Sequence, residues 1–131
     1  MLFTVKKPLA ALALLAAPLL SPLATAESLT NKSTAVQQGE YLAKLGNCTG
    51  CHTSLAGPPM AGGREISSPY GRFISPNITA GGIGEWSADE FYSALHNGLK
   101  PDGSSLYPVC PFPSYTQVRR QDTDDIFLYL Q

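Results

Sequence analysis

Apolar residues recur with a helical period in the stretch that follows residue 33. Four of them share one helix face at i, i+4, i+7 and i+10: Ala35, Gly39, Leu42 and Leu45. This spacing is typical of a stripe that packs against a core. Thr34 and Gln37 form a capping-box pattern that predicts the start of this helix, and Gly46 with Asn47 predicts its end. Gly39 lowers helix stability by itself, so we expect a crossing helix to approach it closely.

Two more helices are predicted towards the C-terminus. Ser87 and Glu90 form a second capping-box pattern, and Gly98 follows as a C-terminal cap. The apolar residues between these caps are Ala88, Phe91, Tyr92 and Leu95. The last helix is expected to begin near Asp122, Asp124 and Asp125, because the helix dipole favours negative charge in the first turn. Its apolar face consists of Ile126, Tyr129 and Leu130.

The segments between these helices are predicted to be loops. Proline and glycine interrupt residues 53–85 so often that we expect one long loop without strands of any length. Residues 106–115 contain Pro108, Pro111 and Pro113, which predicts an extended loop. A loop of about thirty residues in a compact domain usually has a function, such as wrapping a bound group. The pattern as a whole predicts a small all-α domain with long loops.

The N-terminal residues have the pattern of a secretory signal peptide. Lys6 and Lys7 are followed by an apolar stretch over residues 9–20, and Ala24-Thr25-Ala26 is a small-residue cleavage site. The apolar stretch is too short and too interrupted by proline to favour a membrane anchor. We therefore expect a signal peptide over residues 1–26, export to the periplasm, and one mature domain over residues 27–131 without a transmembrane span.

Composition and charge narrow the classes of function for the mature domain. Two of the nine basic residues lie in the predicted signal peptide, which leaves residues 27–131 with a net charge of −3. An acidic domain is not expected to bind nucleic acid. All 12 glycines lie in this part, so much of its backbone must be turns. Such chains usually need a cofactor or a covalent crosslink for stability.

The strongest chemical signal is the pentapeptide Cys48-Thr49-Gly50-Cys51-His52, which occurs once. C-x-x-C-H is the attachment motif of a c-type haem. Two thiols three positions apart can each form a thioether to one porphyrin, and the adjoining imidazole then reaches the iron. The motif therefore predicts one covalent haem c, with Cys48 and Cys51 as the tethers and His52 as the proximal iron ligand.

Two other readings of these cysteines are less consistent with the sequence. A C-x-x-C pair can be a redox dithiol, but that role needs a strand-rich thioredoxin-like setting, which does not flank Cys48. A zinc site could combine Cys48, Cys51, His96 and Cys110, but the second half of the chain lacks the paired ligand spacing of such sites.

The order of elements resembles that of class I c-type cytochromes, which implies crossed terminal helices and long loops around one haem. Shorter motifs resemble the haem domains in the cytochrome subunits of membrane-bound alcohol, aldehyde and gluconate dehydrogenases. These motifs are Gly39-Glu40-Tyr41-Leu42-Ala43, Ala61-Gly62-Gly63-Arg64, Ser75-Pro76-Asn77-Ile78-Thr79, Gly82-Ile83-Gly84-Glu85-Trp86-Ser87 and Leu106-Tyr107-Pro108. Such subunits often carry three haem domains, so the chain is expected to be either a one-haem relative or a piece of a larger protein.

The chain departs from this resemblance at the distal iron ligand. The family's loop reads Tyr-Pro-Ala-Met-Pro, whereas here Cys110 stands where the ligating methionine is expected. The resemblance makes Cys110 a candidate distal ligand; the alternatives are an inert or disulfide-seeking thiol and five-coordinate iron. Met60 is expected to be a packing residue, and His96 a surface or hydrogen-bonded histidine.

These features predict an electron carrier, not an enzyme. The resemblance implies that it receives electrons from a dehydrogenase and passes them to a respiratory acceptor, and any association with a membrane is expected to run through such a partner. Two alternatives remain open. One is a sulfur-oxidising cytochrome that resembles thiosulfate dehydrogenase, which uses histidine and cysteine as iron ligands. The other is a gas-binding haem protein, which needs an open iron position.

Overall fold

The chain is helix-rich and contains one small sheet. The computed structural model describes residues 23–107 and 109–131, so residues 1–22 of the predicted signal peptide lie outside the described residues. The elements in chain order are α1 (Leu23–Leu45), α2 (Cys48–His52), β1 (Glu65–Ser68), β2 (Gly71–Ile74), α3 (Ala80–Ile83), α4 (Ala88–Asn97), the 3-10 helix η1 (Phe112–Ser114) and α5 (Arg120–Leu130). Among the described residues, no helix is both long and apolar enough to span a membrane.

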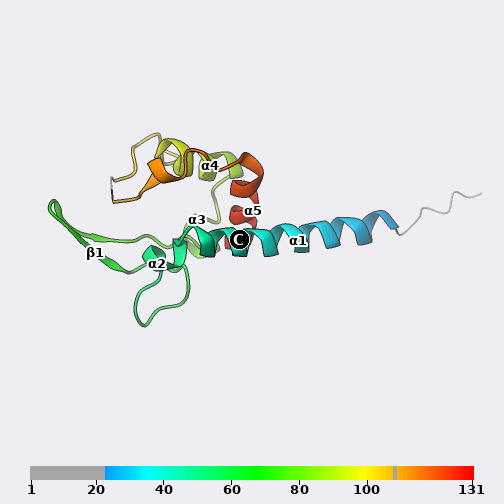
Figure 1. Ribbon diagram of the computed structural model, residues 1–131, viewed down its shortest axis with the longest axis horizontal. Coiled ribbons are helices and arrows are strands. Elements are labelled where there is room, and N and C mark those ends of the chain that lie inside the picture. The colour runs from blue at the N-terminus through cyan, green and yellow to red at the C-terminus, as the bar shows by residue number, and fades with distance from the viewer. Residues whose placement is uncertain (1–22, 108) are drawn as a thin grey trace, which may run out of the picture.

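Helix α1 begins well before the predicted start at Thr34. It already includes Leu23 and continues to Leu45, and its N-terminal turns extend away from the other elements (Figure 1). The prediction that the helix starts at Thr34 is wrong. Residues 23–38 contain no proline or glycine, so nothing in this stretch prevents the helix from beginning earlier. The predicted end is confirmed, since Asn47 adopts a left-handed φ of 55° directly after the turn.

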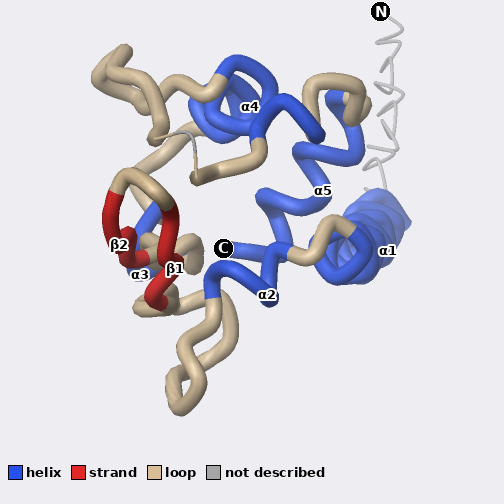
Figure 2. The backbone as a smooth tube through the Cα atoms, turned by 60° about the vertical axis from the view of Figure 1, so that its left-hand side comes forward, coloured by secondary structure: helices blue, strands red, loops and turns tan. Residues whose placement is uncertain are grey.

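Helices α1, α4 and α5 form the helical part of the molecule. Among the described elements, α1 makes its most extensive contact with α5, which also contacts α4, and Figure 2 shows α5 between the other two. A Cβ atom added to Gly39 would overlap the carbonyl group of Asp125 in α5. The expectation that another backbone approaches Gly39 is therefore confirmed.

The described core is small. Its buried cluster joins α1, α4 and α5 to the loops between them and consists of Ala43, Met60, Ile83, Phe91, Ile126 and Leu130. Phe91 of α4 stacks on Phe127 of α5, with the ring centroids 5.2 Å apart. These contacts hold the helices together. They also anchor the segment between α2 and α4 to the core, through Met60 and Ile83.

The expectation of an unbroken loop over residues 53–85 is wrong, because a β-hairpin and the short helix α3 interrupt it, and the hairpin also departs from an all-α chain. Strands β1 and β2 form an antiparallel hairpin in which Ile66 pairs with Phe73, and the hairpin lies across the molecule from α1 (Figure 2). Gly71 closes the turn with a φ of 127°. The Ser68 hydroxyl stabilises this turn, because it donates to the Gly71 carbonyl and accepts from the Tyr70 N–H.

Candidate functional site

Helix α2 is a single short helix that consists of the C-x-x-C-H motif. Residues three and four positions apart lie on the same face of a helix, so Cys48, Cys51 and His52 share one face. All three side chains are half-buried, and the three cysteines of the described residues are free thiols. Burial raises the pKa of the Cys48 thiol, and the thiols of Cys51 and Cys110 raise it further. The three motif side chains are thus presented together as two free thiols and one imidazole.

The imidazole of His52 has a fixed orientation. Its Nδ1 atom lies 2.9 Å from the backbone carbonyl oxygen of Pro76. A carbonyl oxygen can only accept, so Nδ1 carries a proton, and in the neutral imidazole the lone pair lies on Nε2. In metal-ligating histidines in general, a hydrogen bond from the ring nitrogen that does not bind the metal sets the tautomer and the orientation of the ring. Nε2 is therefore the ring nitrogen of His52 that could bind a metal.

The loop that supplies the Pro76 carbonyl is itself held in place. Gly62 donates its N–H to the His52 carbonyl at 2.7 Å and has a φ of 73°. A Cβ atom at this position would overlap the backbone of Pro76, so only glycine allows the two loops to approach this closely. Asn77 accepts from both the N–H and the hydroxyl of Thr79. The partner of His52 is therefore part of a rigid turn.

Met60 lies beside the motif as a packing residue, as predicted. Its side chain is only 3% exposed and belongs to the core cluster. The hydroxyl of Thr49, inside the motif, lies 3.9 Å from the Met60 sulfur, and the Met60 carbonyl accepts from the Ile78 N–H. Met60 thus connects the motif to the loop that carries Pro76.

Cys110 lies in the proline-rich loop and is half-buried. Its N–H donates to the Tyr107 carbonyl at 3.0 Å. Burial is the main cause that raises the pKa of its thiol, and the nearby Cys51 adds to the effect. The structure therefore brings this loop to the same side of the molecule as the motif, with the thiol protonated at neutral pH.

The zinc alternative finds no support in the part of the chain that the structure describes. No group of three or more His, Cys, Asp or Glu side chains there could hold a metal ion. His96 belongs to α4, where its ring stacks on Tyr92 at 3.9 Å between centroids. Its Nε2 atom is buried and has no hydrogen-bond partner among the described residues. The expectation of a surface or hydrogen-bonded histidine is therefore wrong for this atom.

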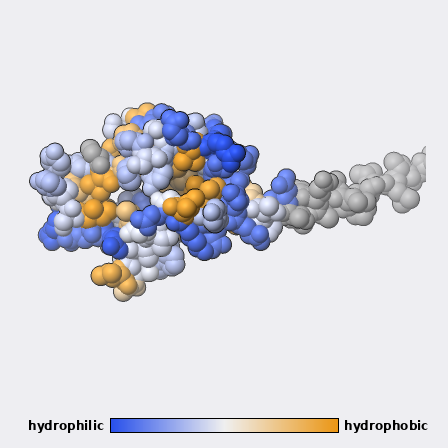
Figure 3. Space-filling view, in the orientation of Figure 1, coloured by the Kyte–Doolittle hydropathy of each residue, from blue (hydrophilic) through white to orange (hydrophobic). Residues whose placement is uncertain are grey.

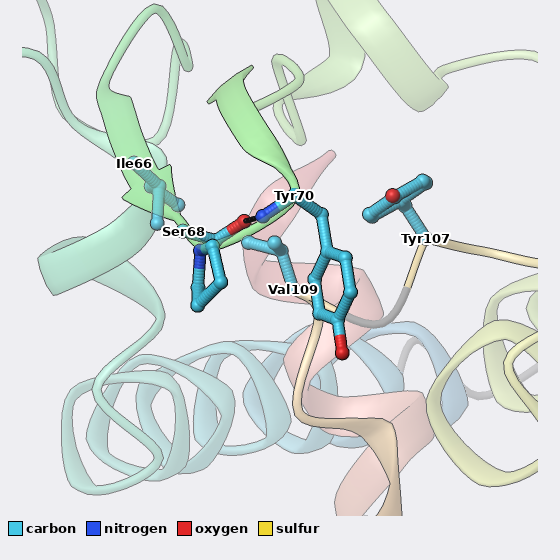
Figure 4. A pocket seen from close by; sticks show the side chains of 6 residues that line it. Ile66, Ser68, Tyr70, Tyr107 and Val109 are labelled. Carbon is cyan, nitrogen blue, oxygen red and sulfur yellow. Dashed lines mark hydrogen bonds between the residues drawn. The ribbon is translucent and has the colours of Figure 1, made fainter.

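A shallow apolar cavity of about 300 Å³ lies between the hairpin and the proline-rich loop (Figure 4). It is lined by Ile66, Ser68, Pro69, Tyr70, Tyr107 and Val109. The Tyr107 ring contacts Phe73 of β2, with 4.2 Å between centroids. The hairpin thus supports the loop at the residues next to Cys110. This support was not predicted, because the strands themselves were not.

Sequence reasoning also missed two groups that position the site. The carbonyl of Pro76 orients His52, and the hydroxyl of Tyr115 donates to the Gly46 carbonyl at 2.8 Å. Pro76 lies within one of the motifs that carry the resemblance, so that motif was the signal available. A backbone carbonyl has no residue-type signature, and no pattern in the sequence pairs Tyr115 with Gly46.

Comparison with known proteins places this site in a class. No family model matches the chain. It is 42% identical over 114 residues to the cytochrome c subunit of a quinone alcohol dehydrogenase from Gluconacetobacter polyoxogenes, a match that covers 85% of this chain and 24% of the relative. It is 41% identical over 97 residues to the gluconate 2-dehydrogenase cytochrome c subunit of Pantoea cypripedii, covering 72% and 22%. A diheme c-type cytochrome of Cereibacter sphaeroides is 34% identical over 101 residues, covering 71% and 34%.

The helix-rich fold, the C-x-x-C-H helix and these similarities together identify the chain as a relative of c-type cytochromes. More narrowly, it is related to the cytochrome c subunits of dehydrogenases, as the sequence motifs predicted. These relatives are cytochrome c subunits of dehydrogenases, which agrees with the prediction of an electron carrier. The chain spans about a quarter or less of the length of these dehydrogenase subunits.

Proposed function

We propose that residues 27–131 form a periplasmic electron-transfer domain that carries one covalently bound haem c. The observation that carries this proposal is the hydrogen bond of 2.9 Å from Nδ1 of His52 to the Pro76 carbonyl. It leaves Nε2 as an oriented ligand on the same helix face as two free thiols. This donor set fits a haem attached by two thioethers and ligated by one imidazole.

Each motif residue has a separate task in this proposal. Cys48 and Cys51 tether the group, and His52 binds its iron from the proximal side. When bound, the haem supplies one-electron oxidation and reduction, and the protein supplies its position and potential. The rigid turn around Pro76 keeps the imidazole in a single orientation. Because the His52 imidazole is held in one orientation, it should move little when the iron gains or loses an electron.

Cys110 is the proposed distal ligand, in the position where the family resemblance places methionine. The loop around it is supported on one side by the contact of Tyr107 with Phe73. A thiolate donates charge and favours ferric iron, whereas a thioether with histidine raises the potential. Burial raises the pKa of the free Cys110 thiol, so ligation has to displace its proton.

The proposed fold is that of a class I cytochrome with crossed terminal helices. The close approach of α1 and α5 at Gly39 supports this arrangement. In the cell, the proposed electron donor is a dehydrogenase and the proposed acceptor a respiratory component. Support for the donor comes from the relatives, which are cytochrome c subunits of alcohol and gluconate dehydrogenases.

The test is the intact mass of the protein produced in a bacterium that matures c-type cytochromes. The expected product starts at Glu27 and keeps the mass of one haem after denaturation. Replacing Cys48 and Cys51 together with serine should remove this increment. Cys110→Ser is the matched control, since it also removes a thiol but should keep the haem. An unmodified mass in the parent protein would refute the proposal.

The same preparation separates the two alternative functions. Spectra of the ferrous protein with added carbon monoxide would reveal an open iron position, which a gas-binding protein needs. Thiosulfate-dependent reduction of an electron acceptor would identify a sulfur-oxidising enzyme. An electron carrier with two axial ligands should show neither response.

A further inference from the structure

We propose that Tyr115 is a positioning residue that holds the Cys110 loop against the haem-attachment segment. This loop is here residues 109–118. The inference rests on the proposed function, because it concerns how a residue outside the motif controls access to the distal side. It is carried by a hydrogen bond between two segments that lie far apart in the sequence.

The Tyr115 hydroxyl donates to the Gly46 carbonyl at 2.8 Å, across a separation of 69 residues. Gly46 directly follows α1 and stands two residues before Cys48. The carbonyl groups at the end of a helix lack partners within that helix, so the phenol satisfies one of them. The bond thereby joins the Cys110 loop to the turn from which the attachment helix α2 begins.

The Tyr115 ring and the Cys48 thiol both lie close to Gly46. A Cβ atom added to Gly46 would be 3.6 Å from Cε1 of Tyr115 and 3.7 Å from Sγ of Cys48. Burial is the main cause that raises the pKa of the Tyr115 phenol, and the thiols of Cys48, Cys110 and Cys51 raise it further. The phenol therefore remains a donor at neutral pH, in contact with the segment that carries the first tether.

The backbone between Cys110 and Tyr115 transmits this attachment. The Tyr115 N–H donates to the Phe112 carbonyl at 2.8 Å, and the Ser114 N–H donates to the Pro111 carbonyl at 2.9 Å. These bonds form the short helix η1 directly after Cys110. Phe112 in turn packs against Gly98 at the end of α4. Movement of Tyr115 would therefore displace η1 and the adjacent Cys110.

The alkylation rate of Cys110 provides a direct measure of this role, because iodoacetamide can react with this sulfur only when the loop opens and the sulfur is not bound to the proposed haem iron. The chain has three cysteines, and two of them are consumed by the thioethers in the holoprotein. The rate at which iodoacetamide alkylates the remaining thiol then reports how often the loop opens. The experiment uses the haem-loaded protein after treatment with a phosphine reductant, and Tyr115→Phe removes the hydroxyl while it keeps the ring.

We expect Tyr115→Phe to be alkylated about five times faster, the factor expected from the loss of one partly buried hydrogen bond. Tyr41→Phe is the matched control, because it removes the same atom from an exposed tyrosine of α1. Ile126→Val removes one methyl group from the core and controls for general destabilisation. Both controls should stay within about twofold of the parent rate.

Gly46→Val tests the same contact from the other side, since its methyl groups need the space beside the Tyr115 ring. It should also accelerate alkylation. The inference is overturned if both variants at this contact react at the parent rate, or if Ile126→Val accelerates the reaction as much as Tyr115→Phe does. A parent protein without the haem mass would instead refute the proposed function and, with it, this inference.

Discussion

The two ring nitrogens of His52 have different partners, and this difference determines what the residue can do. Nδ1 lies 2.9 Å from the Pro76 carbonyl, which fixes the proton on that atom and leaves Nε2 as the donor to a metal. His96, the other histidine, has a buried Nε2 atom without a partner in the described residues but does not share a helix face with two thiols. Only His52 combines an oriented ring with two thiols on the same helix face.

His52→Ala should abolish the low-spin spectrum of the ferric protein and leave the haem attached. The reason is that the proposed thioethers involve Cys48 and Cys51, whereas the proposed role of the imidazole is to bind the iron as its proximal ligand. Absorption spectra and intact mass, recorded on the same sample, test both parts. His96→Ala is the control and should keep the low-spin spectrum. If the spectrum survived in His52→Ala, the proximal assignment would be wrong.

Cys110→Met should raise the reduction potential by ~59 mV or more, which corresponds to about 1.4 kcal/mol for one electron. A thiolate places negative charge on ferric iron, and a neutral thioether does not reproduce that preference for the ferric state. Redox titration of both proteins measures the change. Met60→Leu controls for loss of a buried sulfur near the motif. An unchanged potential together with an unchanged ferric spectrum would show that Cys110 does not ligate the iron.

At the residue scale, the contiguous motif was predictable and its environment was not. Cys48, Cys51 and His52 form a local pattern whose chemistry follows from spacing alone. The group that orients His52 is the backbone carbonyl of Pro76, 24 residues further along the chain. Every residue has such a carbonyl, so the sequence could not identify this one. The hydrogen bond from Tyr115 to Gly46 could not be predicted either, because its acceptor is also a backbone carbonyl.

Helix α4 is the element that the sequence predicted most completely. Both halves of its capping box are present: the Glu90 N–H donates to the Ser87 hydroxyl at 3.2 Å, and the Ser87 N–H donates to the Glu90 carboxylate at 2.7 Å. Gly98 ends the helix with a φ of 66°. These signals lie within a few residues of each other, so they act before any tertiary contact forms.

Ser87→Ala should lower the free energy of unfolding of the holoprotein by about 1 kcal/mol, the usual effect of losing an N-cap. The backbone N–H of Ser87 is the main cause that lowers the pKa of the Glu90 carboxyl, and the Ser87 hydroxyl, which Ser87→Ala removes, lowers it further. A lowered folded-state pKa gives stability that is present above the unfolded pKa and is lost as the pH falls through the folded pKa. Ser87→Ala should weaken this acid dependence.

Urea unfolding at neutral and at acidic pH measures both effects. Ser67→Ala is the control, because Ser67 is an exposed residue of β1 without a role at a helix end. Equal stability of Ser87→Ala and the parent protein at neutral pH would contradict a structural role for the cap.

The elements that sequence reasoning missed depend on non-local pairing or on missing stop signals. Strands β1 and β2 have four residues each, too few for an alternating pattern to be recognised. Their stability comes from cross-strand pairs such as Ile66 with Phe73. Helix α1 extends to Leu23 because nothing in the sequence interrupts it there. Local capping patterns can indicate a helix start, but they do not prevent a helix from continuing past them.

At the scale of the whole molecule, long loops make up much of the described chain, and the buried core is small. The projecting loop after α2 carries Leu55, which is fully exposed, and Figure 3 shows the apolar residues of this face in separate patches among hydrophilic ones. The buried apolar residues of the described chain gather mainly between α1, α4 and α5. The hairpin contacts the segment that leads into the Cys110 loop through the tilted rings of Phe73 and Tyr107.

This distribution predicts that the covalent haem contributes a large part of the stability. A domain of this size with few buried apolar side chains gains little from its own core, and any group that binds only the folded state stabilises it. The variant with serine at both Cys48 and Cys51 should therefore unfold at a much lower temperature, with less helix by circular dichroism. Cys110→Ser loses the proposed distal ligand but keeps the haem, and it should therefore melt at a much higher temperature than the haem-free variant. If the haem-free variant melted as cooperatively and at the same temperature as the holoprotein, the helical core alone would be sufficient for folding.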